Sequence, residues 1–131
     1  MSKIRVYIAS PYTHGWHADN VRLQLEAKHM MMDYGFVPFA PLINHFDEIF
    51  RHREEKEWYE WDLEWLKQCN CVVRIRPNGR DGKEIPSNGA DEEEKYANDL
   101  GIPVFVVKDL TELEAWCKEH KGETMEEMKH E

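Results

Sequence analysis

An alternation of strand-like runs with helical segments is the feature of this sequence that most constrains its fold. The expected strands cover residues 3–9, 36–39, 70–75 and 102–107. The expected helices have apolar residues at three- and four-residue spacing, such as Val21, Leu25 and Met31 in the first. They cover residues 16–34, 55–68, 88–100 and 110–119. Strands that alternate with helices in this way form βαβ units and a parallel sheet.

The alternation predicts an α/β protein with a Rossmann-like (flavodoxin-like) parallel sheet of about four to five strands and helices on both faces. Sheets of this class bind small ligands beyond the carboxyl ends of their strands. Residues 10–15, 38–45 and 76–89 follow three of the expected strands, so we expect them to surround one cleft. Residues 42–53 fit either a short helix or an irregular flap.

We expect one domain over residues 1–120, because the sequence shows neither an internal repeat nor an interdomain linker. The segment 121–131 is strongly charged, and we expect it to fray. No metal site is expected, because the histidines do not form a recognisable zinc-binding pattern.

Charge and composition restrict the class of partner. The 131 residues include 17 Lys and Arg and 26 Asp and Glu, and the formal net charge of −9 repels the phosphates of duplex nucleic acid. No apolar run approaches the roughly 20 residues of a membrane span. No signal peptide is recognisable, and an odd number of cysteines argues against a disulfide framework. We therefore expect a cytoplasmic protein that acts on a small molecule or on another protein.

Two carboxylates stand out because they fall on the apolar faces of two expected helices. Asp62 lies in the apolar stripe of the second helix, four residues after Trp58. Glu93 lies among the inward residues of the third helix, four residues before Ala97. Burial disfavours the ionised form of a carboxyl group, so an inward acid is retained for a hydrogen bond, an ion pair or chemistry.

Each of these acids has a structural explanation and a functional one. An inward acid can cap a loop or pair with an arginine such as Arg22 or Arg74. Two acids that flank one expected cleft favour a catalytic site, and a pair of carboxylates suits cleavage of a glycosidic bond. One carboxylate then attacks or stabilises the anomeric carbon, while the other manages the proton of the leaving group.

Three motifs occur in order within residues 4–107. The first expected strand contains Tyr7 and ends in a serine turn. Residues 61–73 read W-D-L-E-W-L-K-Q-C-N-C-V-V, and residues 86–97 read P-S-N-G-A-D-E-E-E-K-Y-A, with the spacing S-x-G-x-x-x-E-x-x-x-A. In this order the motifs resemble the nucleoside 2-deoxyribosyltransferase superfamily. They are most similar to its 2′-deoxynucleoside 5′-phosphate N-hydrolase branch and to related phage and bacterial proteins.

The resemblance implies a role for each matching residue. Glu93 matches the nucleophile that attacks C1′ of the deoxyribose and forms a glycosyl-enzyme intermediate. Asp62 matches the acid that contacts the base and assists its departure, and Tyr7 matches the tyrosine that orients the nucleophile. Ser87 and Gly89 match the turn that receives the 5′ end of the substrate, where a helix N-terminus favours an anion.

The first turn departs from the pattern of the hydrolase branch. Ser10 matches the serine of this turn, but Tyr12 and His14 stand where the family often has Ile and Arg. We count Ser10 and Tyr12 among the substrate-binding residues. His45 joins them, because it follows a short strand in a segment that is expected to line the cleft.

The sequence thus predicts an enzyme that cleaves the N-glycosidic bond of a 2′-deoxynucleoside or of its 5′-monophosphate, without a metal or organic cofactor. For a 5′-phosphate, Arg76 or Arg80 of the long loop would replace the arginine of the first turn. One alternative is a nucleotide- or partner-binding module that has kept the fold and lost catalysis. Another is a different glycosidic substrate, such as a ribonucleotide or a nicotinamide dinucleotide.

The resemblance also implies a homodimer or a higher homo-oligomer, often with a neighbouring subunit that completes the pocket. The helix with Trp58, Trp61 and Trp65 has more aromatic residues than one inward stripe requires. We expect this helix to form the interface, because aromatic residues are enriched in contacts between subunits.

Overall fold

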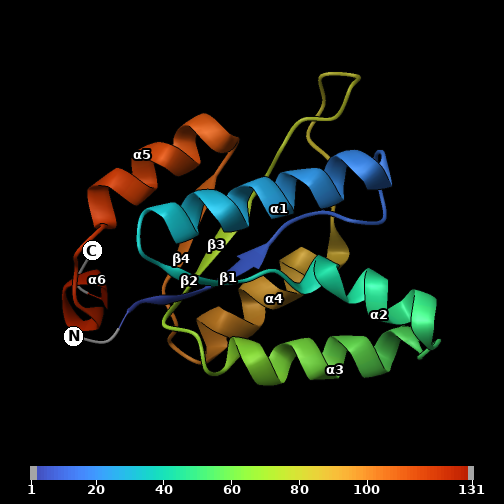
Figure 1. Cartoon of the computed structure of the whole chain (residues 1–131), viewed down its shortest axis with the longest axis horizontal. Coiled ribbons are helices and arrows are strands. Elements are labelled where there is room, and N and C mark those ends of the chain that lie inside the picture. Colours follow the sequence, from blue (N-terminus) through green and yellow to red (C-terminus); the bar gives the residue numbers. More distant parts are fainter. Residues whose placement is uncertain (1–2, 130–131) are drawn as a thin grey trace.

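The computed structural model describes residues 3–129, except for the side chains of His45 and Lys129. Within this part of the chain, four parallel strands form one sheet in the order β2-β1-β3-β4 (Figure 1). They are β1 (Arg5–Ala9), β2 (Val37–Phe39), β3 (Cys71–Ile75) and β4 (Val104–Val107). This order is flavodoxin-like, and its switch point, where ligands bind in such sheets, lies between β1 and β3. The predicted α/β fold is confirmed.

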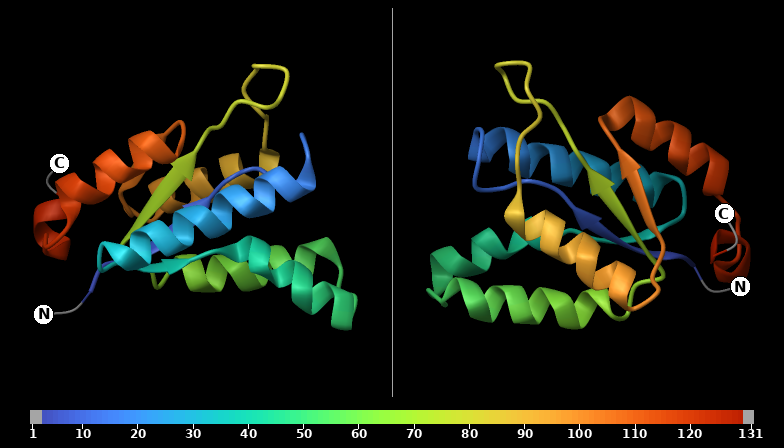
Figure 2. Two further views of the ribbon diagram at one scale, coloured as in Figure 1. Left: turned by 45° about the horizontal axis from the view of Figure 1, so that its top comes forward. Right: turned by 180° about the vertical axis from the view of Figure 1, so that it is seen from behind.

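Helices cover both faces of the sheet, as Figures 1 and 2 show. One face is covered by α1 (His17–Asp33) and α5 (Leu110–His120), and the other by α3 (Glu55–Leu66) and α4 (Asn88–Asp99). Successive side chains of a strand point to opposite faces. In β1, Val6 and Ile8 therefore join the core under α1 and α5, whereas Tyr7 joins the core under α3 and α4. This alternation places the Tyr7 phenol on the same side of the sheet as both candidate acids.

The inward face of α1 differs from the face that its apolar spacing indicates. Asn20 and Gln24 are buried with Ala27 and Met31, whereas Val21 and Leu25 remain partly exposed. The two amides are tolerated inside because they form hydrogen bonds to neighbouring loops. A helix can thus bury polar residues when the adjacent backbone supplies their partners.

The segment that fits either a helix or a flap is helical. It begins with a short 3₁₀ helix, η1 (Pro41–Ile43), and continues as α2 (Asn44–Phe50). Phe46, Ile49 and Phe50 of α2 are exposed by 63%, 84% and 91%. In Figure 1, α2 lies at one end of the molecule, beside α3.

Part of the charged segment that follows residue 120 is helical. Helix α6 (Met125–Lys129) follows α5, and Met128 is 1% exposed within the core under α1 and α5. The Thr124 hydroxyl accepts a hydrogen bond of 3.2 Å from the Glu127 amide at the start of this helix. A single buried methionine among charged residues thus anchors a segment whose composition predicts disorder.

Candidate active site

The centre of the candidate site is a buried contact between a strand and a helix. Tyr7 of β1 donates a hydrogen bond from its hydroxyl to Glu93 Oε2 on α4. Tyr7 is 0% exposed and Glu93 is 8% exposed. The two residues are 86 positions apart in sequence, and the packing of α4 on the sheet brings them together.

Burial changes the acidity of both partners. Burial, together with the smaller effect of the nearby Asp62 charge, raises the pKa of Glu93 to about 8. The hydrogen bond from Tyr7 and the charge of Arg74 oppose this rise by favouring the ionised carboxylate. Burial and the Glu93 carboxylate raise the pKa of Tyr7 well above its ordinary value, so the phenol keeps its proton and remains a donor.

The second acid approaches the same place from α3. Burial raises the pKa of Asp62 to about 7. Asn44, at the start of α2, opposes this rise by donating a hydrogen bond of 2.8 Å from Nδ2 to Asp62 Oδ1. Because the charge of Asp62 acts on both Tyr7 and Glu93, the three groups are electrostatically coupled. Carboxyl groups with a pKa near 7 can donate and accept protons at neutral pH.

Neither arginine that could neutralise the inward acids pairs with them. Arg74 hydrogen-bonds Asp91, and Arg22 lies 3.9 Å from Glu26 on the outside of α1. Neither arginine forms an ion pair with Asp62 or Glu93 among the described residues. The two acids are instead held by the neutral hydrogen-bond donors described above.

The first turn is held by buried amides of α1. Gln24 donates a hydrogen bond of 2.8 Å from Nε2 to Ser10 Oγ, and its Oε1 accepts one of 2.8 Å from the Leu42 amide. Asn20 donates from Nδ2 to the carbonyl oxygens of Tyr12 and His14, at 3.0 and 2.7 Å. These bonds connect the turn after β1 to the segment after β2, so two of the expected cleft-lining segments share one support.

Three of these polar residues are not among the predicted site residues: Asn20, Gln24 and Asn44. For Asn20 and Gln24 a signal was present, because they lie four residues apart and in register with the buried Ala27 and Met31. The same signal, a polar residue at an inward position of a helix, identifies Asp62 and Glu93 in the sequence.

The predicted substrate-binding residues lie in several environments. Ser10 is 7% exposed, and the Tyr12 ring stacks on His17 with 4.4 Å between ring centroids. Ser87 caps α4 by accepting a hydrogen bond of 3.1 Å from the Ala90 amide. The side chain of His45 lies outside the described part of the chain.

Gly89 leaves open space at the start of α4. Its φ is not positive, and an added Cβ would meet no atom within 4 Å. The fold itself therefore does not require a glycine at this position. Gly89 stands four residues before Glu93, roughly 6 Å along the helix axis. A ligand that contacts Glu93 thus lies within reach of the exposed N–H groups of this helix end.

The loop between β3 and α4 folds back on itself and packs against the first turn. Asn78 and Glu84 form an antiparallel bridge, and the loop projects from the sheet in Figure 1. Arg80 stacks 3.8 Å above the Trp16 ring and donates hydrogen bonds of 2.8 and 3.1 Å to the Asp19 carboxylate.

Both arginines that were candidates for a phosphate contact are engaged by carboxylates. Arg80 pairs with Asp19, as described above. Arg76 donates a hydrogen bond of 3.1 Å to Glu94 and lies 3.6 Å from Glu84. The positive charge of each guanidinium is therefore partly neutralised by a neighbouring carboxylate.

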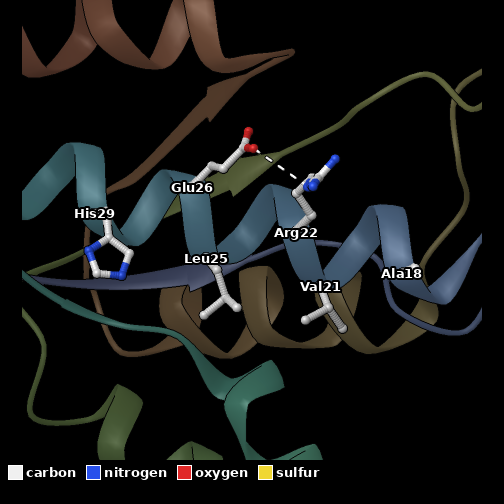
Figure 3. Close-up of a pocket in the computed structure, with 6 residues that line it drawn as sticks. All are labelled: Ala18, Val21, Arg22, Leu25, Glu26 and His29. Atoms are coloured by element: carbon white, nitrogen blue, oxygen red, sulfur yellow. Dashed lines mark ion pairs between the residues drawn. The ribbon is translucent and has the colours of Figure 1, made fainter.

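A separate hollow lies on the outside of α1 (Figure 3). Figure 3 shows Val21, Leu25 and His29 along one edge of α1, with the Arg22–Glu26 ion pair along the other. Its lining comes from α1 alone and includes none of the acids described above. This hollow is thus distinct from the candidate active site.

Two kinds of feature are absent from the described residues. No group of three or more His, Cys, Asp or Glu side chains in residues 3–129 is arranged to hold a metal ion. None of the helices in that range is long and apolar enough to cross a membrane.

Comparisons with known proteins agree with the fold and with the order of the motifs. The family model of nucleoside 2-deoxyribosyltransferase matches residues 6–128. A solved structure of a 2-deoxyribosyltransferase from the psychrotolerant bacterium Bacillus psychrosaccharolyticus aligns with a TM-score of 0.60 and 23% sequence identity. The alignment covers 78% of this chain and 70% of that chain, and at this identity it supports the fold alone. A search of curated proteins finds no match.

The raised pKa of Glu93 predicts that stability depends on pH. Its folded pKa of about 8 exceeds the ordinary value of 4.5, so the folded protein binds more protons than the unfolded chain between these values. The contribution of Glu93 to the free energy of unfolding is therefore complete below about pH 4.5 and is lost as the pH rises through 8. Glu93→Gln removes this dependence. Relative to wild type, we expect the variant to gain on the order of 2–4 kcal/mol between pH 5 and pH 8.

Urea denaturation of both proteins at the two pH values measures this difference. Glu60→Gln is the control, because Glu60 is an exposed glutamate of α3 and should leave the pH dependence unchanged. A free-energy difference between wild type and Glu93→Gln that stays constant from pH 5 to pH 8 would contradict the prediction.

Proposed function

We propose, since the chain belongs to the nucleoside 2-deoxyribosyltransferase family, that it cleaves the N-glycosidic bond of a 2′-deoxynucleoside or of its 5′-monophosphate. The observation that carries the proposal is the buried Glu93 carboxylate, which accepts a hydrogen bond from Tyr7 and lies within the electrostatic reach of Asp62. A buried acid without a cationic partner in direct contact costs stability, and acids of this kind are concentrated at catalytic sites.

The proposed reaction has two steps. In the first, a Glu93 oxygen attacks C1′ of the deoxyribose, the C1′–N bond breaks, and the departing base takes the proton of Asp62. In the second, water or a second base attacks C1′, the ester to Glu93 breaks, and Asp62 recovers a proton from the attacking group. Tyr7 fixes the orientation of the carboxylate through its hydrogen bond. This is the double displacement of a retaining glycosidase, with one acid as nucleophile and the other as general acid and base.

The 5′ end of the substrate is proposed to lie at the start of α4, against Ser87 and Gly89. The open space beside Gly89 and the unpaired N–H groups of a helix N-terminus support this placement. Ser10, Tyr12 and His45 complete the proposed binding set. Engagement of the loop arginines by carboxylates favours an uncharged 5′-hydroxyl over a 5′-phosphate.

A test incubates the protein with each 2′-deoxynucleoside and each 5′-monophosphate, with and without a free acceptor base, and detects the released base by reverse-phase chromatography. We expect turnover that Glu93→Gln lowers by at least about 10³-fold, because the variant has no nucleophile. Glu60→Gln, which changes an exposed glutamate of α3, should keep the wild-type rate. Equal base release by wild type and Glu93→Gln from every substrate would refute the proposal. Tight nucleotide binding without base release would instead favour the binding-module alternative.

The proposed role of Asp62 predicts a dependence on the leaving group. Asp62→Asn cannot protonate the departing base, so we expect kcat for ordinary purine substrates to fall about 10²–10⁴-fold. For a 7-methylated purine, which leaves without protonation, the loss should be at least tenfold smaller. Steady-state kinetics on the two substrates measure the ratio. Equal losses on both substrates would show that Asp62 does not act as the acid.

We further propose that the chain forms a homo-oligomer through the surface of α2 and α3. Phe46 and Phe50 of α2 are largely exposed, and Trp61 and Trp65 of α3 are exposed by 44% and 48%. A group of large apolar side chains at the surface is typical of a protein–protein interface. In a twofold-symmetric dimer this surface of one copy packs against the same surface of the other copy, so the apolar side chains of both copies are buried.

Light scattering coupled to gel filtration tests this assembly. Wild type should elute as a dimer or larger species at micromolar concentration, and Phe50→Glu should lower the mass to that of one chain. Met125→Glu is the control, because Met125 is an exposed methionine of α6. A monomeric wild-type protein under these conditions would exclude the oligomer.

A further inference from the structure

Arg74 is the largest of the side chains that the described structure buries fully, and the proposed reaction does not use it. It is 1% exposed and belongs to the central strand β3. Its register partner on β1 is Ala9, and Val72, two residues earlier on the same face, pairs with Tyr7. Arg74 and Tyr7 therefore rise from neighbouring positions of the sheet toward the same helix, α4.

Arg74 contacts two acids of α4 that lie on either side of Glu93 in sequence, Asp91 and Glu94. Its Nη2 donates a hydrogen bond of 2.9 Å to Asp91 Oδ1, and its Nε lies 3.6 Å from Glu94 Oε1. Asp91 and Glu94 are three residues apart, so they lie on one side of α4 with Glu93 between them in the chain. The guanidinium thus holds the turn of the helix that carries the candidate nucleophile.

A purely structural role does not explain why this residue is an arginine. Nε and Nη1 are buried and have no hydrogen-bond partner among the described residues. A buried charge with unfilled hydrogen bonds is costly, and well-packed apolar side chains often replace buried ion pairs without loss of stability. Selection for stability alone would therefore favour an apolar residue here.

We propose that Arg74 is a positioning residue, which orients Glu93 toward Tyr7 through its contacts with Asp91 and Glu94 and favours the ionised form of the Glu93 carboxylate through its charge. The inference rests on the proposed function, in which Glu93 is the nucleophile. It adds a residue from β3 to a site that otherwise draws on β1, α3 and α4.

The charges around Glu93 show why a cation is needed. Tyr7 faces it from β1, Asp62 and Tyr59 from α3, and Glu92 precedes it on α4. Asp62 and Glu92 both disfavour ionisation of Glu93, as does burial, whereas the Arg74 charge favours it. Because a carboxylate attacks carbon only in its ionised form, removal of the Arg74 charge should reduce the fraction of active protein near neutral pH.

The experiment compares Arg74→Gln, Arg74→Lys and wild type. Arg74→Gln keeps a hydrogen-bond donor for Asp91 and removes the charge, whereas Arg74→Lys keeps the charge. Two readouts are measured: the pH profile of kcat/KM, and the titration of the Glu93 carboxyl carbon by NMR, assigned from its loss in Glu93→Gln. Lys95→Gln is the control, because it removes an exposed cation two residues from Glu93.

We expect Arg74→Gln to move the acid limb of the profile and the Glu93 titration upward by about one pH unit, with a tenfold loss of kcat/KM below the limb. Arg74→Lys and Lys95→Gln should leave both midpoints near the wild-type values. An unmoved Glu93 titration in Arg74→Gln would overturn the proposal, even if the melting temperature falls. The NMR titration needs no turnover, so it tests Arg74 even if no substrate is cleaved and the proposed function fails.

Discussion

The hydrogen bond from Tyr7 to Glu93 is the contact on which the candidate site depends. It joins the central strand β1 to α4 inside the core, where water cannot substitute for either partner. A buried carboxylate requires such a donor, and a buried phenol requires an acceptor, so each group explains the presence of the other. The remaining parts of the site are arranged around this pair, with Asp62 on α3 and Arg74 on β3.

The sequence predicts the fold well because strands and helices leave strong periodic patterns. It also predicts both inward acids, since Asp62 and Glu93 interrupt apolar stripes whose spacing is otherwise regular. The family model matches nearly the whole chain, which agrees with the motif order that suggested the resemblance. A polar residue on an otherwise apolar helix face can thus be recognised from the sequence alone.

Other features could not be predicted because they depend on partners from distant elements. Gln24 connects the turn after β1 to η1, and Asn44 reaches Asp62 from α2, contacts that no spacing within one helix encodes. The inward face of α1 differs from the predicted face for the same reason, since its amides are stable inside only next to those loops. Met128 is the opposite case: its segment is charged in composition, yet this one apolar side chain packs into the core under α1 and α5.

The contact between the β3–α4 loop and the first turn has a consequence for how the protein responds to ionic strength. Three contacts join these segments: the exposed Arg80–Asp19 ion pair, the stacking of Arg80 on Trp16, and the packing of Ile85 against Gly15. Salt screens the ion pair and leaves the packing of Ile85 intact. Concentrated electrolyte should therefore loosen the tip of the loop around Arg80 while the segment around Ile85 stays packed against the first turn.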